Sequence, residues 1–376
     1  MAETSLPVDA PVLAVLGGGQ LGRMLAIAGI PLGVRFRFLD PSPDAPAAAL
    51  GPLVVGALGD ASALDETARG ADVVTYEWEG VPGDAAARLA ARVPVHPSVR
   101  ALTVSQDRLR EKQLFTSLGI GVPRFEPVDD RDSLARAVAE IGVPVVVKTR
   151  TGGYDGKGQA VVRTERDADP AWDAIGGVPL LVEQLVPFTR ELSVVGVRGA
   201  GGTTRCWPLT ENRHERGILR RSVAPAADVS PELQARAETF MSRLLDELDY
   251  RGVLALELFE VDGALLANEM APRVHNSGHW TIEGARTSQF ENHVRAVLGW
   301  PLGPTDARGV STMVNCIGAL PDPAAVLAVE GAHLHRYGKS LRTGRKVGHV
   351  TVVADDRDEL ARRVAALERV LPADNG

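Results

Sequence analysis

The chain has 376 residues, a formal net charge of −7, 45% hydrophobic residues and 24% charged residues. This length predicts two or three domains, because one small core cannot organise so long a chain. The acidic balance, with no basic stripe carrying interleaved aromatic residues, argues against a nucleic-acid partner. No apolar run approaches the roughly 18 residues that a membrane-spanning helix needs, so we expect no membrane partner.

The cysteine usage and the N-terminus point to a compartment. Cys206 and Cys316 lie far apart in the sequence, which argues against a disulfide framework and against a cysteine-based zinc site. The N-terminal segment "MAETSLPVDAPVLAVLGGG" lacks the basic region of a signal peptide and runs into a glycine turn. We therefore expect a cytoplasmic protein.

Predicted strands and helices alternate in the first part of the chain. Residues 11–30, "PVLAVLGGGQLGRMLAIAGI", combine a buried strand, a glycine turn and a helix. Further strands are predicted at 34–40, 73–79 and 93–98, and helices at 61–70 and 82–93. This alternation predicts a parallel sheet with helices on both faces, ending near residue 110.

The remainder divides into a larger and a smaller unit. In the larger unit, helices are predicted at 111–120, 131–142 and 288–300, and strands at 122–128, 143–148, 159–164 and 179–186. Strands dominate from 190 to 275. After a linker at 300–309, the smaller unit mixes short strands with an amphipathic helix at 358–371, "DELARRVAALERVL".

The first glycine loop, "GGGQLG" (Gly17 to Gly22), follows a strand and opens a helix, and Asp40 ends the next strand. Backbone N–H groups at such a turn, together with the helix N-terminus, can bind an anion. Taken alone, the pattern fits NAD binding, the binding of a different phosphate, or a plain tight turn.

A second glycine loop, "TGGYDGKGQ" (151–159), is more specific. Its glycines are Gly152, Gly153, Gly156 and Gly158. Their backbone N–H groups could point inward around a polyphosphate, and Lys148 and Lys157 add charges that pair with phosphate oxygens. The loop joins two predicted strands, so it predicts a flexible flap and not a P-loop.

Paired carboxylates lie on a predicted hairpin, "LALELFEVDGALLANEM", with Glu257 and Glu269 on two strands joined at Asp262-Gly263. Carboxylates on neighbouring strands suit a Mg²⁺ ion that also bridges ATP phosphates. A two-residue turn, however, sets Glu257 opposite Asn268 and turns Glu269 to the other face. Both glutamates share a face only if an extra residue enters, as in a bulge or a three-residue loop, and we predict that shift.

Three further groups have alternative interpretations. His275 and His279 in "HNSGHW" lie in a predicted loop, which favours an anion site over a zinc pair. Glu77 and Glu79 follow a strand, where carboxylates either meet ribose hydroxyls or cap the next turn. The basic cluster at 339–346, "KSLRTGRK", is either an anion site or a solvated turn.

Several longer motifs run in order along nearly the whole chain: "LGGGQLGRMLA", "KTRTGGYDGKGQ", "EQLVPFTRELSV", "ENRHERGIL", "NEMAPRVHNSGHWTIEGARTSQFENHVRA" and "YGKSLRTGRKVGHV". With these motifs the chain resembles the ATP-grasp superfamily and, within it, the 5-(carboxyamino)imidazole ribonucleotide synthases. The resemblance implies a fold of mixed α/β and α+β class. Its parts would be an N-terminal Rossmann-like (preATP-grasp) domain with a parallel sheet at 1–111, a central ATP-grasp domain at 112–300 with a mobile lid at about 120–190, and a small C-terminal domain at 301–376.

The resemblance also implies an activity. Members of this family use ATP and bicarbonate to carboxylate the amino group of 5-aminoimidazole ribonucleotide (AIR) in purine biosynthesis. The reaction proceeds through carboxyphosphate and releases N5-carboxyaminoimidazole ribonucleotide (N5-CAIR), ADP and phosphate, with Mg²⁺ at the nucleotide, and relatives are commonly homodimers. The alternatives are another ATP-grasp carboxylase or ligase acting on a different amine, an NAD-dependent oxidoreductase, and a non-catalytic nucleotide-binding protein.

The resemblance assigns site residues by motif. The ATP site would comprise Arg108, Lys148, Gly153, Tyr154, Asp155, Gly156, Lys157, Gly158, Gln159, Glu183, Gln184, Leu185, Val186, Glu191, His214, Asn268 and Glu269. Catalysis on bicarbonate and carboxyphosphate would involve Tyr154, Asp155, Arg273, His275 and Asn276. AIR would contact Gln20, Leu21, Glu77, Lys339, Arg345 and Lys346, and Mg²⁺ would be held by Glu257 and Glu269. Many ATP-grasp enzymes have a third metal ligand, an asparagine, where this chain has Ala271, so water or Asn268 would complete the shell.

Overall fold

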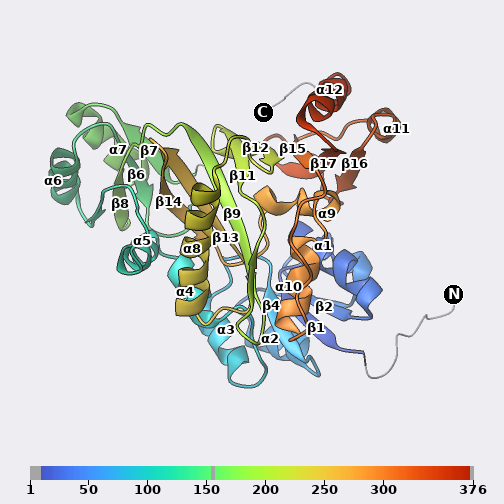
Figure 1. Ribbon diagram of the computed structural model, residues 1–376. Helices are drawn as coiled ribbons and strands as arrows, with labels where there is room; N and C mark the ends of the chain where they lie inside the picture. Colours follow the sequence, from blue (N-terminus) through green and yellow to red (C-terminus); the bar gives the residue numbers. More distant parts are fainter. Residues whose placement is uncertain (1–9, 154–156, 373–376) are drawn as a thin grey trace.

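The computed structural model describes residues 10–153 and 157–372. Figure 1 shows a blue N-terminal unit at the bottom, a green unit at the left and a red C-terminal unit at the upper right, around long central strands. Within the described residues, no helix is both long and apolar enough to cross a bilayer.

The N-terminal unit is a parallel sheet with the strand order β3-β2-β1-β4. Its strands are β1 (Val12–Leu16), β2 (Arg35–Asp40), β3 (Leu53–Val55) and β4 (Val73–Tyr76). Its helices are α1 (Gln20–Gly29), α2 (Ala61–Ala68), α3 (Gly83–Ala90) and α4 (Val99–Ser105). Every residue of β1 and β4 is buried, as expected when both faces of a sheet are covered. The predicted parallel sheet is confirmed.

The strand predicted at 93–98 is wrong. In this segment only a single bridge forms, between Val95 and Val74. Pro94 and Pro97 flank the bridge, and proline has no N–H to donate to a ladder.

A second unit, the lid sheet, has the strand order β5-β8-β6-β7 and lies at the left in Figure 1. Its strands are β5 (Phe125–Val128), β6 (Val145–Thr149), β7 (Gln159–Val162) and β8 (Leu180–Gln184). Its helices are α6 (Arg131–Ile141) and α7 (Ala168–Ile175). The core beneath them is drawn from residues 128–182, so this sheet buries its own apolar face.

The largest sheet runs through the centre of the molecule with the order β14-β13-β9-β11-β12-β15-β17-β16. Its first strands are β9 (Arg190–Arg198), β11 (Thr210–Glu215), β12 (Ile218–Ala224), β13 (Gly252–Val261) and β14 (Ala264–Ala271), with β10 (Thr204–Cys206) beside β9. The C-terminal unit adds β15 (Val310–Ile317), β16 (Ala332–Arg336) and β17 (Lys346–Ala354). Because β15 pairs with β12, the C-terminal unit extends the central sheet.

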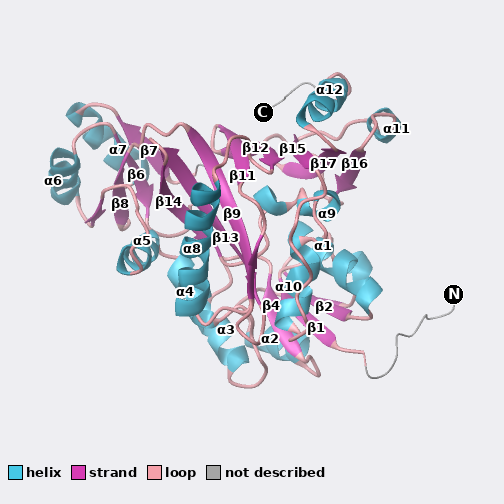
Figure 2. Ribbon diagram, in the orientation of Figure 1, coloured by secondary structure: helices cyan, strands magenta, loops and turns pink. Residues whose placement is uncertain are grey.

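Helices cover this sheet, as the cyan ribbons in Figure 2 show. They are α5 (Arg108–Ser117), α8 (Pro231–Glu247), α9 (Thr281–Gly284), α10 (Gln289–Val297), α11 (Pro323–Leu327) and α12 (Arg357–Glu368). Short 3₁₀ turns lie at Ile30–Leu32, Ala48–Leu50, Glu165–Asp167 and Asn276–Gly278. The sequence interpretation described 190–275 as mostly strands and missed α8.

The β13–β14 hairpin has the irregular register that the carboxylate pair requires. Val261 pairs with Ala264, so the turn is the two residues Asp262 and Gly263, both with positive φ (49° and 74°). The register shifts between Leu256 and Leu258, so an extra residue enters on β14. The predicted shift is confirmed, and it takes the form of a bulge at Asn268 and Glu269.

Candidate active site

Helix α5 brings a cation to the β14 bulge. The Arg108 guanidinium lies in its first turn and forms an ion pair with Glu269 (Nη1 to Oε2, 2.6 Å). Burial alone would raise the pKa of Glu269, but Arg108 outweighs it and holds that pKa at about 2. Glu269 therefore carries a full negative charge at neutral pH.

Glu257 lies on the neighbouring strand and behaves differently. Burial, followed by the negative charge of Glu269, raises the pKa of Glu257 to about 7. The imidazole of His275 lies 3.3 Å from this carboxylate (Nε2 to Oε1). Burial, and then Arg273 and Lys346, lower the pKa of His275 well below its ordinary value. The effect of Glu269 on the pKa of Glu257 shows that the two carboxylates lie close together. Two carboxylates in such proximity favour the binding of an additional cation.

A divalent cation fits this hairpin only in part through protein ligands. Within residues 10–153 and 157–372, no group of three or more His, Cys, Asp or Glu side chains is arranged to hold a metal ion. Asn268 precedes Glu269 in the sequence, and its buried Oδ1 atom has no hydrogen-bond partner among the described residues. Two carboxylates with one amide oxygen suit a hard cation whose remaining ligands are phosphate and water oxygens.

The lid sheet contributes a cation, a buried carboxylate and a small pocket to the candidate site. Lys148 on β6 lies 3.2 Å from the buried carboxylate of Glu183 on β8. A small pocket opens beside them, lined by Pro123, Val146, Lys148, Glu183, Gln184, Leu185, Val186, Phe188 and Phe259. Its lining includes the rings of Phe188 and Phe259, which stack with centroids 4.8 Å apart. The structure thus gathers Lys148 and the whole 183–186 segment around one pocket.

Glu191 and His214 form a pair on β9 and β11. The Nδ1 atom of His214 lies 2.8 Å from Oε2 of Glu191. Although burial lowers it, the hydrogen bond to Glu191 leaves the pKa of His214 raised. Since Glu257 adds to this shift, His214 also lies within electrostatic reach of the carboxylate pair.

The segment after β14 joins the remaining predicted residues to two other units, Arg273 to the N-terminal unit and Asn276 to the C-terminal unit. Arg273 makes a two-pronged ion pair with Glu79 that includes Nη2 to Oε1 at 2.9 Å. Asn276 exchanges amide hydrogen bonds with Asn315 of β15 (3.1 and 2.7 Å). Sequence reasoning left Glu79 open between a ribose contact and a turn cap, and it missed both the pairing of Glu79 with Arg273 and the role of Asn315, because both contacts join residues far apart in the chain.

The residues predicted for AIR divide into two groups. Lys339 donates a hydrogen bond to Gln20 and influences the pKa of Glu77, so these three lie together. The Leu21 side chain is buried in the apolar core, which leaves its backbone for any ligand contact. Arg345 donates to Ser340 in its own loop (2.7 Å).

Lys346 lies on the other side of this basic loop. It influences the pKa values of Glu257, His214 and His275. The structure therefore places its charge toward the carboxylate pair rather than beside Gln20 and Glu77.

The first glycine loop is already occupied by side chains of the protein. The Gly18 N–H donates to Asp40 (2.8 Å), and the N–H groups of Gly19 and Gly22 donate to Glu77 (2.8 and 2.9 Å). A dinucleotide would need those same donors for its pyrophosphate. This geometry disfavours the NAD interpretation.

The second glycine loop is described only at its ends. Gly153 accepts a hydrogen bond from Arg108 (3.5 Å), Gly158 has a positive φ of 70°, and Gln159 pairs with Lys148 in the ladder. Lys157 is exposed. The predicted residues Tyr154, Asp155 and Gly156 lie outside the described residues.

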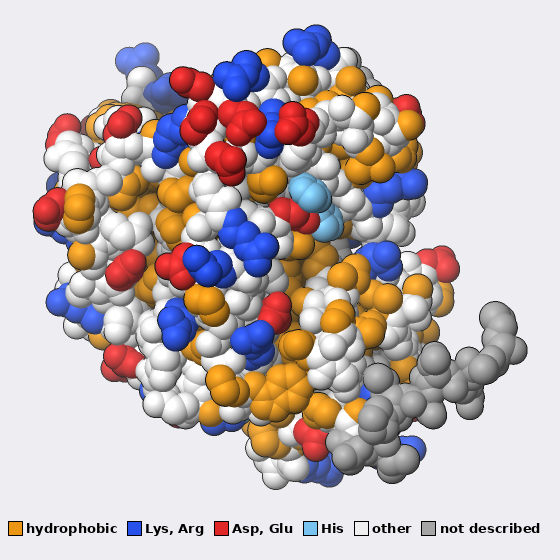
Figure 3. All heavy atoms as spheres, turned by 45° about the vertical axis from the view of Figure 1, so that its right-hand side comes forward, with side chains coloured by type: hydrophobic (Ala, Val, Ile, Leu, Met, Phe, Trp, Pro, Cys, Tyr) orange, Lys and Arg blue, Asp and Glu red, His pale blue; other side chains and the backbone are white. Residues whose placement is uncertain are grey.

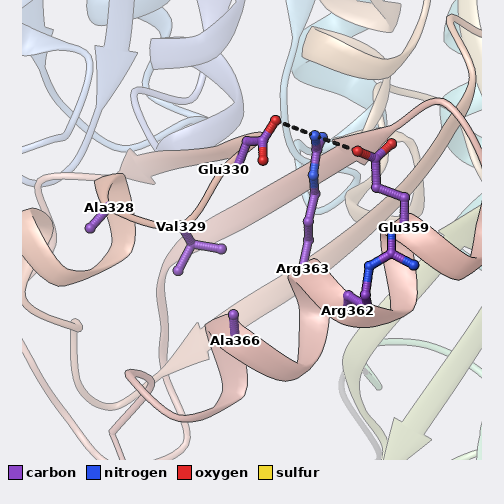
Figure 4. Close-up of a pocket in the computed structure, with 7 residues that line it drawn as sticks. All are labelled: Ala328, Val329, Glu330, Glu359, Arg362, Arg363 and Ala366. Carbon is purple, nitrogen blue, oxygen red and sulfur yellow. Dashed lines mark hydrogen bonds and ion pairs between the residues drawn. The ribbon is translucent and has the colours of Figure 1, made fainter.

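Two further surface features are one face of the molecule and a pocket of the C-terminal unit. On the face in Figure 3, acidic and basic side chains are interspersed. The pocket in Figure 4 belongs to the C-terminal unit and is lined by Ala328, Val329, Glu330, Glu359, Arg362, Arg363 and Ala366. There Arg363 points to Glu330 (2.6 Å) and Glu359 (2.8 Å), so its charge is compensated.

Three family models match consecutive parts of the chain. The ribonucleotide synthetase preATP-grasp domain matches residues 11–106, the ATP-grasp domain matches 113–290, and the phosphoribosylaminoimidazole carboxylase C-terminal domain matches 311–363.

Individual relatives cover almost the whole chain. An N5-carboxyaminoimidazole ribonucleotide synthase of Pseudomonas aeruginosa is 53% identical over 361 residues, which is 96% of this chain and 99% of the relative. The crystal structure of the N5-carboxyaminoimidazole ribonucleotide synthetase of Thermus thermophilus has a TM-score of 0.93 and 55% identity, covering 97% of this chain and 99% of that one. A structure of the Aspergillus clavatus synthase in complex with ADP and 5-aminoimidazole ribonucleotide has a TM-score of 0.89 and 30% identity, covering 96% and 98%. The chain belongs to the N5-carboxyaminoimidazole ribonucleotide synthase family of ATP-grasp enzymes.

Proposed function

We propose that the protein is an ATP-dependent carbon–nitrogen ligase that carboxylates the amino group of AIR with bicarbonate, giving N5-CAIR, ADP and phosphate. The observation that carries this proposal is the bulged hairpin, which places Glu257 and Glu269 on one face with Arg108 against Glu269. Family membership across nearly the whole chain supports the choice of AIR over another amine.

The first half-reaction asks mainly for charge neutralisation. ATP transfers its γ-phosphoryl group to a bicarbonate oxygen, which gives ADP and carboxyphosphate. Arg108 and Lys148 border the site from α5 and β6 and would balance the phosphate charge. Glu257, Glu269 and the Oδ1 atom of Asn268 would hold Mg²⁺, which supplies further charge neutralisation when bound.

The second half-reaction moves the carboxyl group. The AIR nitrogen attacks the carboxyl carbon, phosphate leaves, and one proton must depart from that nitrogen. Burial lowers the pKa of His275 well below its ordinary value, so His275 stays neutral and would position the reactants by hydrogen bonding, while the departing phosphate takes up the proton. Arg273, fixed by Glu79, would face the anion. Tyr154 and Asp155 would close the loop over the intermediate, since carboxyphosphate must be shielded from water.

Substrate placement and assembly complete the proposal. Gln20, Glu77 and Lys339 would hold AIR from the N-terminal unit, while Lys346 would approach from β17. A cytoplasmic homodimer is the state we propose on the basis of the family resemblance, and light scattering of the purified protein tests the dimer.

The deciding experiment measures ADP release by the purified protein with MgATP and bicarbonate, with and without AIR. We expect AIR to stimulate ADP release and N5-CAIR to form in equal amount. Glu269→Ala should lower the AIR-stimulated rate by about a hundredfold or more, because it removes a metal ligand and the partner of Arg108.

Glu260→Gln is the matched control. Glu260 lies on the same hairpin but pairs with Arg190 (2.5 Å) and is remote from the carboxylate pair in register. This variant should keep the wild-type rate. Tight MgATP binding without stimulation by AIR would refute the assigned substrate, and other amines would then be screened.

A further inference from the structure

A buried lysine that sequence reasoning missed joins two sides of the nucleotide site. Lys112 lies one helical turn after Arg108 on α5, and its side chain is 1% exposed. Residues four apart share a face of a helix, so Arg108 and Lys112 both point toward the β13–β14 hairpin.

The Lys112 ammonium has three N–H donors, and three oxygen atoms of other residues lie close to it. It lies 2.7 Å from the carbonyl oxygen of Asn268, 3.3 Å from that of Ala267 and 3.2 Å from Oε2 of Glu183. Two hydrogen bonds and one ion pair therefore compensate its buried charge. Burying a cation is costly unless it is paired in this way.

The acceptors come from different units. Asn268 and Ala267 belong to β14, the edge strand of the central sheet, at the bulge that orients Glu269. Glu183 belongs to β8 of the lid sheet and lines the pocket beside Lys148. Glu111, next to Lys112, accepts a hydrogen bond from the N–H of Met270 (2.7 Å), so α5 covers this edge strand on both sides of Glu269.

We propose that Lys112 is a positioning residue of the nucleotide site. Its ammonium fixes Glu183 of the lid against the bulge of β14, and this contact sets the spacing between the 183–186 segment and the carboxylate pair. The proposal rests on the proposed function, because it takes a nucleotide to be the molecule that spans those two places. Lys112 is not itself a lining residue of the pocket, and it acts there through Glu183, which is one.

The test compares Lys112→Met with wild type by calorimetric titration with MgADP and by steady-state kinetics. Losing a buried charged hydrogen bond should weaken MgADP binding and raise the KM for ATP by about tenfold or more, and change the KM for AIR far less. Lys112→Gln keeps one amide donor and should fall between the two, and it replaces the methionine variant if that variant does not fold.

A structural control separates positioning from general destabilisation. Phe115→Leu removes volume from a fully buried side chain on the same helix, so it should lower the melting temperature and leave the Kd for MgADP unchanged. Wild-type affinity for MgADP in both lysine variants would overturn the proposal. So would an equal loss of ATP and AIR affinity in Lys112→Met. Because MgADP binding is measured without turnover, failure of AIR to stimulate the wild type would refute the function and leave this comparison intact.

Discussion

At the scale of single residues, burial decides which histidines stay neutral, and His293 has the best-defined partners. Its Nδ1 accepts the N–H of Val253 on β13 (3.1 Å), and its Nε2 lies 2.9 Å from the Thr75 hydroxyl on β4. It thereby links the parallel N-terminal sheet to the central sheet. Burial lowers the pKa of His293 to about 3.

This depressed pKa predicts an acid-sensitive contribution to stability. In the unfolded chain His293 binds a proton below about pH 6.5, whereas in the folded chain the His293 imidazole stays neutral down to about pH 3. The free energy of unfolding should therefore fall as pH decreases from 6.5, by about 1.4 kcal/mol per pH unit from this residue. Urea unfolding between pH 7 and pH 4.5 measures the slope.

His293→Gln should lower the free energy of unfolding at pH 7. It should also make the pH slope shallower by about 1.4 kcal/mol per pH unit, which is the contribution of one proton. His333→Gln changes an exposed histidine and should keep the wild-type slope. An unchanged slope in His293→Gln would show that His293 is not the group that takes up the proton on unfolding.

At the scale of elements, the β13–β14 hairpin depends on its turn as well as on its bulge. Asp262 and Gly263 both have positive φ, which is the geometry of a type I′ turn that matches the twist of paired strands. No atom of the described residues lies within 4 Å of a Cβ added at Gly263. Any cost of a side chain there is therefore one of backbone conformation.

Gly263→Ala should lower the free energy of unfolding by about 1 kcal/mol, because alanine pays to adopt a φ of 74°. Gly201→Ala is the matched control: an added Cβ there also meets nothing within 4 Å, and its φ lies outside the left-handed region. Chemical unfolding of both variants gives the comparison. Equal effects of the two substitutions would contradict the conformational argument.

Local patterns predicted the elements whose signals lie close together in sequence. The alternation of strands and helices predicted the parallel sheet. Because side chains alternate between the two faces of a strand, placing Glu257 and Glu269 on one face required a bulge in the hairpin of β13 and β14. Helix α8 was missed although Ser230 caps it and its buried residues, such as Leu233, Ala237 and Leu244, follow helical spacing. Lys112 was beyond reach, because its acceptors lie 155 and 156 residues away, and no local pattern encodes such a contact.

At the scale of the whole molecule, the apolar cores divide the chain differently from the sheets. One core combines Leu13 and Leu25 of the N-terminal unit with Val195, Val253 and residues of α10 from the central unit. These two units therefore share buried surface. The lid sheet instead has its core drawn from residues 128–182. Units with separate cores can open separately.

This division predicts how nucleotide binding changes backbone dynamics. In amide hydrogen exchange followed by mass spectrometry, peptides from β6 and β8 should exchange faster than peptides from β9 and β13, because the lid sheet has its own small core. MgADP should slow the lid peptides most, since Lys148 and Glu183 lie on that sheet and line the pocket. Peptides from β1 and β2 should change little and serve as the internal control. Equal exchange in β8 and β13, with equal protection by MgADP, would mean that the lid and the central sheet open as one unit, and binding would then have to act on the molecule as a single body.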